Sequence, residues 1–122
     1  MTRNVNLQFQ YLTEKYSFPK KEILLGYKFK RINVKKNSVL LTTGEICRYA
    51  YFICEGCLRT YFVNEKREEK TRAIAFENRF ISASASFITQ TPSSECIQAL
   101  EHSELLRISR DDLQQLIDNN PF

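Results

Sequence analysis

The sequence contains no tryptophan, only one histidine (His102) and only three glycines among its 122 residues. A single histidine excludes a cupin-type metal centre built on a His-x-His pair. A Ser-His-Asp triad would have to use this histidine, which lies in a predicted turn with no nucleophile-elbow motif in the chain. Three glycines leave no glycine-rich phosphate loop of the Walker or dinucleotide-binding type. We therefore expect His102 to be a surface residue, no resident metal or cofactor, and a binding or sensing domain rather than an enzyme.

Long apolar runs are also missing. No stretch approaches the roughly 18 residues that a membrane-spanning helix needs, and the N-terminus lacks the apolar segment of a secretory signal. Hydrophobic residues make up 43% and charged residues 26% of the chain, as in ordinary globular domains. The sequence thus predicts a cytoplasmic protein with no membrane partner, folded as a single domain over residues 1–122. In that compartment the four cysteines are expected to be thiols: Cys47, Cys54, Cys57 and Cys96.

The net charge of +4 is mild, and much of the basic excess lies between Lys15 and Lys36. A basic stripe follows a phosphate backbone in some nucleic-acid-binding proteins, but no DNA-reading motif accompanies this one. We interpret these side chains as solvated lysines on a surface helix and an edge strand. Charge alone does not indicate nucleic-acid binding.

Cys54 and Cys57 form a Cys-x-x-Cys pair, a spacing that binds zinc or supports redox chemistry in other proteins. No second cysteine pair completes a zinc site. The pair flanks Glu55-Gly56, which we predict to be a two-residue hairpin loop with Gly56 at positive φ. Without a helix N-terminus there is little to lower a thiol pKa. The sequence therefore favours two ordinary strand cysteines.

Helical spacing of apolar residues predicts N-terminal helices within residues 1–29. Over residues 30–109 the period changes to two, and turn residues recur about every 8–12 residues, which predicts about eight antiparallel strands. A C-terminal helix is expected over residues 110–119, with Ser109 and Asp112 in capping-box positions. The whole pattern is typical of a mainly β sandwich or jelly roll with flanking helices. The predicted strands include Val39–Leu41, Tyr51–Cys54, Cys57–Val63, Lys70–Phe76, Glu95–Leu100 and Leu105–Ile108.

The order and spacing of several segments resemble the cyclic-nucleotide-binding domain of Crp/Fnr-type bacterial transcription regulators. Residues 80–109 keep the family's spacing without a gap, and Gly44 and Gly56 stand at the family's turn glycines. The resemblance covers roughly residues 30–122 and implies an antiparallel double-stranded β-helix, a jelly-roll β-roll, that senses a ligand. The segments that carry it are Val39–Glu45, Tyr51–Arg59, Phe80-Ile81, Phe87, Ile97–Glu101 and Leu105–Ser109.

The resemblance also implies a phosphate-binding cassette after the Phe-Ile pair. In cyclic-nucleotide-binding members the cassette begins with Gly-Glu, forms a short helix and ends in Arg-Ser or Arg-Thr followed by Ala. The glutamate accepts a hydrogen bond from the ribose 2′-hydroxyl, and the arginine pairs with the cyclic phosphate. Here Ser82-Ala83 stand at the Gly-Glu positions and Ser93-Ser94-Glu95 at the end. Both charged partners are gone, so the cassette is degenerate and usual cyclic AMP binding is not expected.

Small polar groups nevertheless remain for a ligand. The run from Ser82 to Ser86 predicts a short helix with Ser82 as its cap and free backbone N–H groups at its start. An uncharged or weakly anionic effector would use these groups; a degenerate pocket that holds water is the alternative. Arg72 and Arg79 are nearby candidates to replace the cassette arginine. The candidate ligand-binding residues are Ser82, Ala83, Ser84, Ala85, Ser93 and Ser94.

Regulators of this family usually continue through a long dimerisation helix into a helix-turn-helix. The sequence stops at Phe122, before either fits, so DNA is expected as a partner only through a C-terminal domain missing from this chain. Any homodimer is expected to be weaker than in complete members, or differently arranged. Two functions stay open. One is the sensor domain of a regulator with an unknown small-molecule effector or none, and the other is a stand-alone jelly-roll module that binds a small molecule or a protein.

Overall fold

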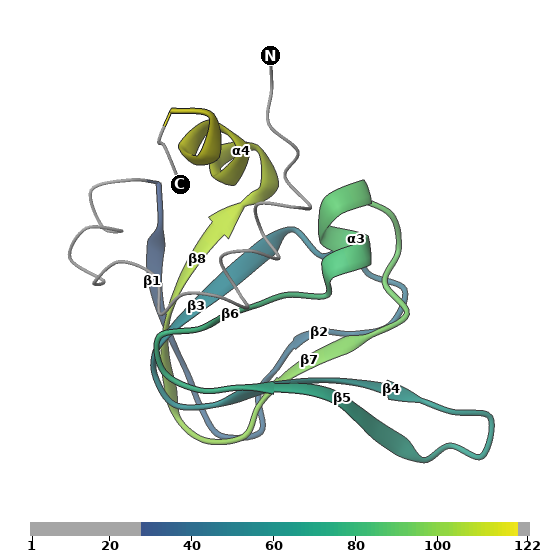
Figure 1. The fold of residues 1–122 in the computed structure, drawn as a ribbon. Helices are drawn as coiled ribbons and strands as arrows, with labels where there is room; N and C mark the ends of the chain where they lie inside the picture. Colours follow the sequence, from purple (N-terminus) through teal and green to yellow (C-terminus); the bar gives the residue numbers. More distant parts are fainter. Residues whose placement is uncertain (1–27, 120–122) are drawn as a thin grey trace.

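The computed structural model describes residues 28–119, which form eight strands and two helices (Figure 1). The helices predicted within residues 1–29 lie outside the described residues, apart from Lys28 and Phe29, which precede the first strand without forming a helix. The helices are α3 (Ser84–Thr89) and α4 (Arg110–Asn119). The strands are β1 (Lys30–Val34), β2 (Val39–Leu41), β3 (Tyr49–Glu55), β4 (Leu58–Val63), β5 (Glu69–Ala75), β6 (Phe80–Ile81), β7 (Cys96–Ala99) and β8 (Ser103–Ser109).

The strands form two four-stranded sheets, in the orders β1-β8-β3-β6 and β2-β7-β4-β5. Every pair of neighbouring strands is antiparallel. The sheets enclose a common interior, with α3 between β6 and β7 in the chain and α4 continuing from β8 (Figure 1). The predicted mainly β jelly roll is therefore confirmed. Neither helix in the described part of the chain is long and apolar enough to cross a membrane.

The connection at Glu55-Gly56 is not a hairpin loop, so that prediction is wrong. β3 pairs with β8 and β6, whereas β4 pairs with β5 and β7, and the chain crosses here from one sheet to the other. Gly56 has the expected positive φ, 107°. A Cβ atom on Gly56 would also lie 2.1 Å from Oγ and 2.8 Å from Cα of Ser103. Hairpins and corners between sheets both need a tight turn with glycine, so the local sequence does not distinguish them.

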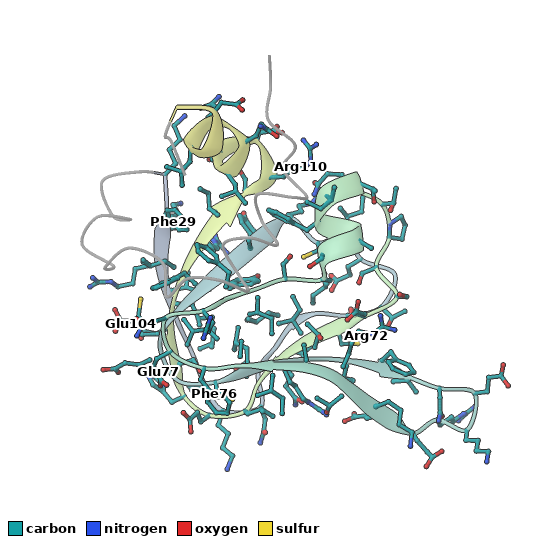
Figure 2. The ribbon with its side chains drawn as sticks, in the orientation of Figure 1. Phe29, Arg72, Phe76, Glu77, Glu104 and Arg110 are labelled. Atoms are coloured by element: carbon teal, nitrogen blue, oxygen red, sulfur yellow. The ribbon has the colours of Figure 1, made fainter. Side chains whose placement is uncertain are left out.

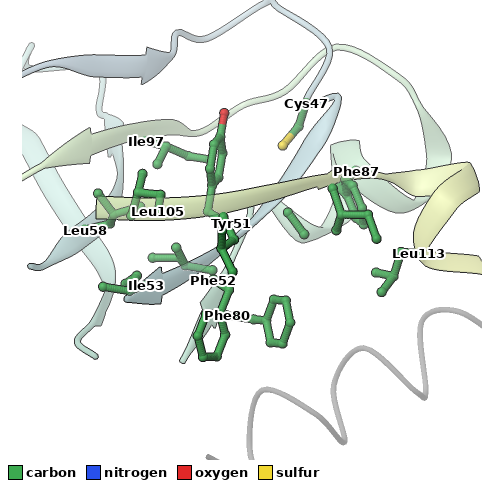
Figure 3. Close-up of a cluster of buried hydrophobic side chains, with 14 of the residues drawn as sticks. Cys47, Tyr51, Phe52, Ile53, Leu58, Phe80, Phe87, Ile97, Leu105 and Leu113 are labelled. Carbon is green, nitrogen blue, oxygen red and sulfur yellow. The ribbon is translucent and has the colours of Figure 1, made fainter. Parts of the chain in front are cut away.

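The hydrophobic core lies between the two sheets (Figure 3). Ile53 of β3 and its pairing partner Leu105 of β8 come from one sheet, and Leu58 of β4 and Ile97 of β7 come from the other; all are almost completely buried. Both helices contribute to the same core, because Phe87 of α3 is 0% and Leu113 of α4 is 1% exposed. The position of α3 is therefore fixed by apolar burial, which contributes about 1.5–3 kcal/mol for a large side chain.

Helix α4 begins where the sequence predicts. Ser109 Oγ accepts a hydrogen bond of 3.2 Å from the backbone N–H of Asp112. Asp111 and Asp112 place negative charge in the first turn, where it interacts favourably with the positive end of the helix dipole. Arg110, labelled in Figure 2, donates from Nε to the carbonyl oxygen of Ile88 in α3 at 2.7 Å. The two helices are thus joined by a direct hydrogen bond.

Candidate functional site

Helix α3 follows β6 directly, and the short helix predicted in the small-residue run is present. Its N-cap residue is Ala83, without a side-chain cap hydrogen bond, so the prediction that Ser82 caps the helix is wrong. The hydroxyl of Ser82 donates instead to the carbonyl oxygen of Tyr49 at 3.3 Å and lies 3.3 Å from Cys47 Sγ. Ser82 is only 7% exposed, and its side chain serves the scaffold rather than the helix terminus.

The other end of α3 is tied to the segment that precedes β3. Ser86 Oγ accepts a hydrogen bond from the Cys47 N–H at 2.8 Å and donates to the carbonyl oxygen of Thr91. Gln90 ends the helix in the left-handed conformation, with φ of 55°. The Gln90 side-chain amide donates to the carbonyl oxygens of Cys47 and Phe87, at 3.0 and 2.8 Å. These contacts hold the backbone of the cassette without any ligand.

Ser93, at the position of the family's arginine, is buried and bonded within its own loop. Its Oγ donates to the carbonyl oxygen of Glu95 at 2.8 Å and accepts from the Glu95 N–H at 2.9 Å. The Ser93 backbone bonds to Gly44 and Glu45 at 2.7 and 2.8 Å. The residue therefore shapes the loop, but it offers a ligand no charge, and its only side-chain donor is already used.

A cavity of about 580 Å³ lies between β5, β6 and the start of α3. It brings together Ser82 and Ser84 of the predicted site, whereas Ala83, Ala85, Ser93 and Ser94 do not line it. Ala83 and Ser93 are buried, and Ser84, Ala85 and Ser94 are exposed. Sequence reasoning missed the opposite wall of the cavity, which is formed by residues Ala73, Ile74, Ala75 and Phe76.

That wall carries an unusual distribution of apolar side chains. Ile74 is 52% and Phe76 is 59% exposed, whereas the smaller Ala75 packs partly buried against the core. β5 is the edge strand of its sheet, so these large side chains have no neighbouring strand beyond them. The alternation of large and small residues in β5 was visible in the sequence. Ile74 in β5 and Phe76 directly after it were the available signal for an exposed apolar patch.

Two charged side chains line the same cavity. Arg79 is exposed, and Glu77 accepts a hydrogen bond on Oε2 from the Gly56 N–H at 2.7 Å. This bond holds the pKa of Glu77 below its ordinary value of 4.5. Glu77, labelled in Figure 2, is therefore ionised near neutral pH, and it joins Gly56 at the corner between the sheets to the lining of the cavity.

Arg72, the other arginine considered from the sequence, lies on β5 and pairs with a carboxylate of the cassette. Its Nε is 3.8 Å from Oε2 of Glu95, and its guanidinium carbon lies 5.4 Å from the centre of the Phe62 ring. The arginine side chain is 61% exposed and that of Glu95 is 16% exposed. The cassette thus meets a cation, but one already paired with Glu95.

The Cys-x-x-Cys pair lacks the properties of a reactive site. Burial raises the pKa of the Cys57 thiol, and the negative charges of Glu101 and Glu77 raise it further. A raised pKa disfavours the thiolate that nucleophilic or redox chemistry needs. His102 is exposed, as expected. Across residues 28–119, no group of three or more His, Cys, Asp or Glu side chains is arranged to hold a metal ion.

The family model of the cyclic nucleotide-binding domain matches residues 31–120. The chain belongs to this family. The resemblance drawn from the segments between Val39 and Ser109 is thereby confirmed. No curated protein matches the sequence in a direct comparison.

Solved structures of this family share the fold at low identity. The catabolite activator protein of Thermus thermophilus has a TM-score of 0.70 at 21% identity, over 87% of this chain and 49% of that chain. The sensor domain of the transcriptional regulator DNR from Pseudomonas aeruginosa has a TM-score of 0.67 at 18% identity, over 95% and 82%. CLP, the c-di-GMP-responsive global regulator of Xanthomonas campestris, has a TM-score of 0.70 at 18% identity, over 81% and 47%.

This cyclic nucleotide-binding domain spans about half the length of the Thermus regulator, 49% of that chain. Its fold is that of the cyclic nucleotide-binding domain family. The short helix expected for the cassette is present as α3, and the resemblance implies that Ala83 and Ser93 stand where nucleotide-binding members carry charge.

Proposed function

We propose that this domain is the non-enzymatic ligand-sensing domain of a Crp/Fnr-like transcription regulator and that it does not bind cyclic AMP or cyclic GMP in the usual way. The proposal that cyclic nucleotides are not bound in the usual way rests on one observation. The two charged positions of the cassette hold Ala83, which is 1% exposed, and Ser93, which is 5% exposed and bonded to the Glu95 backbone. Neither residue supplies a partner for a phosphate or a ribose hydroxyl.

The energetic cost of these replacements is large. A charge-assisted hydrogen bond contributes about 1.5–3 kcal/mol, and more where its loss leaves a buried charge unpaired. Loss of the carboxylate at Ala83 removes a second bond. At about 1.4 kcal/mol per tenfold change, the two losses weaken cyclic nucleotide binding by about a hundred- to ten-thousand-fold.

The cavity beside α3 supports a small effector of another kind. Its volume of about 580 Å³ lies within the roughly 300–1,000 Å³ of small-molecule sites. The serines Ser82 and Ser84 and the apolar wall of β5 suit an uncharged or weakly anionic molecule. A change in the position of α3 on effector binding would be transmitted to α4 through the hydrogen bond between Arg110 and the Ile88 carbonyl. DNA would then be contacted by a separate domain of the regulator.

Calorimetric titration with cyclic AMP tests this function. The unchanged chain is expected to give no saturation in the micromolar range, because both charged partners are missing. The double variant Ala83→Glu/Ser93→Arg restores both partners and is expected to bind about a hundredfold or more tighter.

The matched control is Ala83→Glu/Ser94→Arg, which places the arginine at the exposed neighbouring position and is expected to gain much less. Micromolar binding by the unchanged chain, or equal gains in both double variants, would contradict the proposed function.

A further inference from the structure

The end of the cassette and β5 meet in an ion pair between Glu95 and Arg72. Glu95 follows the loop that Ser93 fixes, and Arg72 immediately precedes Ala73, the first β5 residue of the cavity wall. Their charged atoms lie 3.8 Å apart. The contact is an ion pair rather than a hydrogen bond at this distance.

Contacts place Arg72 beside the end of the cassette. Glu95 directly precedes β7, and Cys96, the first residue of β7, pairs with Tyr61 of β4. Phe62 follows Tyr61 on β4, and the guanidinium carbon of Arg72 lies 5.4 Å from the centre of the Phe62 ring. Arg72 and Glu95 therefore meet where β4 passes the end of the cassette.

A local irregularity of the sheet gives Arg72 this position. The pairing of β4 with β5 shifts register between Thr60 and Tyr61, where Thr60 pairs with Ala73 and Tyr61 with Thr71. Arg72 is the extra residue of this bulge and has no partner residue on β4. Bulges re-aim side chains and recur beside binding sites. Here the bulge brings a cation to the cassette from outside it.

The cassette in turn fixes the carboxylate. The Ser93 hydroxyl bonds to both the carbonyl oxygen and the N–H of Glu95, so the backbone that carries the carboxylate is held on both sides. The Glu95 side chain is only 16% exposed, and the charge that faces it is that of Arg72. A second anion brought to Arg72 would meet this carboxylate at close range, where like charges repel strongly because solvent screening is reduced.

We propose that Glu95 is a specificity-determining residue that occupies, as a built-in anion, the place of a ligand phosphate beside Arg72. The end of the cassette therefore favours an uncharged effector and rejects cyclic phosphates through repulsion, in addition to the missing cassette charges. This inference rests on the proposed function, since it assumes that the ligand site lies at the cassette. Removal of the carboxylate leaves Arg72 as the cation for an incoming phosphate.

A four-variant titration with cyclic AMP tests the inference. Glu95→Ala, which installs the family's small residue, is expected to bind cyclic AMP about 10- to 100-fold tighter than the unchanged chain. Glu95→Gln keeps the shape and is expected to gain similarly. Glu95→Asp keeps the charge and is expected to stay within about twofold of the unchanged chain. Glu95→Ala/Arg72→Gln is expected to lose the gain.

Adenosine, which has no phosphate, serves as the neutral probe, and its affinity is expected to be the same with and without Glu95. Equal cyclic AMP affinity for Glu95→Ala and Glu95→Asp would overturn the inference. Retention of the gain after Arg72→Gln, or an equal gain for adenosine, would overturn it too. Failure of the proposed function is measured on the unchanged chain and on the double variants at Ala83, Ser93 and Ser94, whereas failure of this inference is measured as affinity ratios between the Glu95 and Arg72 variants. Thermal melts of all variants establish that each is folded.

Discussion

The side chains on the two sides of the cassette have different roles: those on one side pack and bond to the backbone, and those on the other carry charge or line the cavity. On the side that faces the sheets, Phe87 is completely buried, and Ser86 accepts a hydrogen bond from the Cys47 N–H before β3 and donates one to the carbonyl oxygen of Thr91 after the helix. On the outer side, Ser84 is exposed at the cavity, and Glu95 pairs with the exposed Arg72. The comparison teaches that the shape of the cassette and its charge are carried by different residues. Under the proposed function, the shape persists although the charges of the family pattern are lost.

The largest effect is expected from Phe87→Ala, which removes the helix anchor on the buried side. Phe87 is 0% exposed, and truncation of a buried phenylalanine costs about 3–5 kcal/mol because a cavity remains. Urea denaturation followed by circular dichroism measures the loss. Ile88→Ala, at the neighbouring and only partly buried position, is the control and is expected to cost less. A loss below about 1 kcal/mol for Phe87→Ala would show that α3 is held from its outer side.

Gly56→Ala is expected to cause the next largest loss of stability, because it strains the corner between the sheets at the residue whose N–H bonds to Glu77. The added Cβ meets Ser103 atoms at 2.1–2.8 Å in a backbone conformation with φ of 107°. Strain and overpacking together are expected to cost about 2–4 kcal/mol of unfolding free energy. Gly44→Ala is the matched control, since its φ is 94° but nothing lies within 4 Å of the added Cβ. Equal losses for the two glycines in urea denaturation would mean that backbone strain alone acts at Gly56.

The smallest of the three losses of stability is expected from Ser86→Ala, which is compared with Ser84→Ala on the other side of the same helix. Ser86→Ala leaves the buried Cys47 N–H without its acceptor and is expected to cost about 1–3 kcal/mol. Ser84→Ala, two residues earlier on the exposed side, is expected to change stability by less than about 0.5 kcal/mol. Thermal unfolding of the two variants in parallel measures the difference. A larger loss for Ser84→Ala would reverse the assignment of the two sides.

Much of the fold was predictable because its signals are local. Alternation predicted the strand over Lys70–Phe76, which corresponds to β5, and the Ser109 cap predicted the start of α4. The sheet partners were not predictable in the same way. The pairing of β3 with β8 joins residues such as Tyr51 and Arg107, which are far apart in the chain. The local turn at Gly56 therefore looked like a hairpin although it changes sheets.

The candidate site was predictable only in outline. The ungapped spacing from Phe80 to Ser109 located the cassette, and the residue types at Ala83 and Ser93 gave the loss of charge. The role of Ser82 was wrong because its hydrogen bond to Tyr49 depends on β3 passing beside the start of α3. The pairing of Arg72 with Glu95 depends on a register shift between β4 and β5, which leaves no mark in the sequence.

The central claim is that the cassette has kept its shape and lost its affinity for cyclic nucleotides. A titration of cyclic AMP into the unchanged chain, followed by amide NMR shifts, tests it most directly at the level of single residues. The account predicts no saturable shifts at Ser82, Ser84 or Glu95 in the micromolar range, in a spectrum that remains that of a folded domain. Saturable shifts at these residues with a micromolar dissociation constant would contradict it.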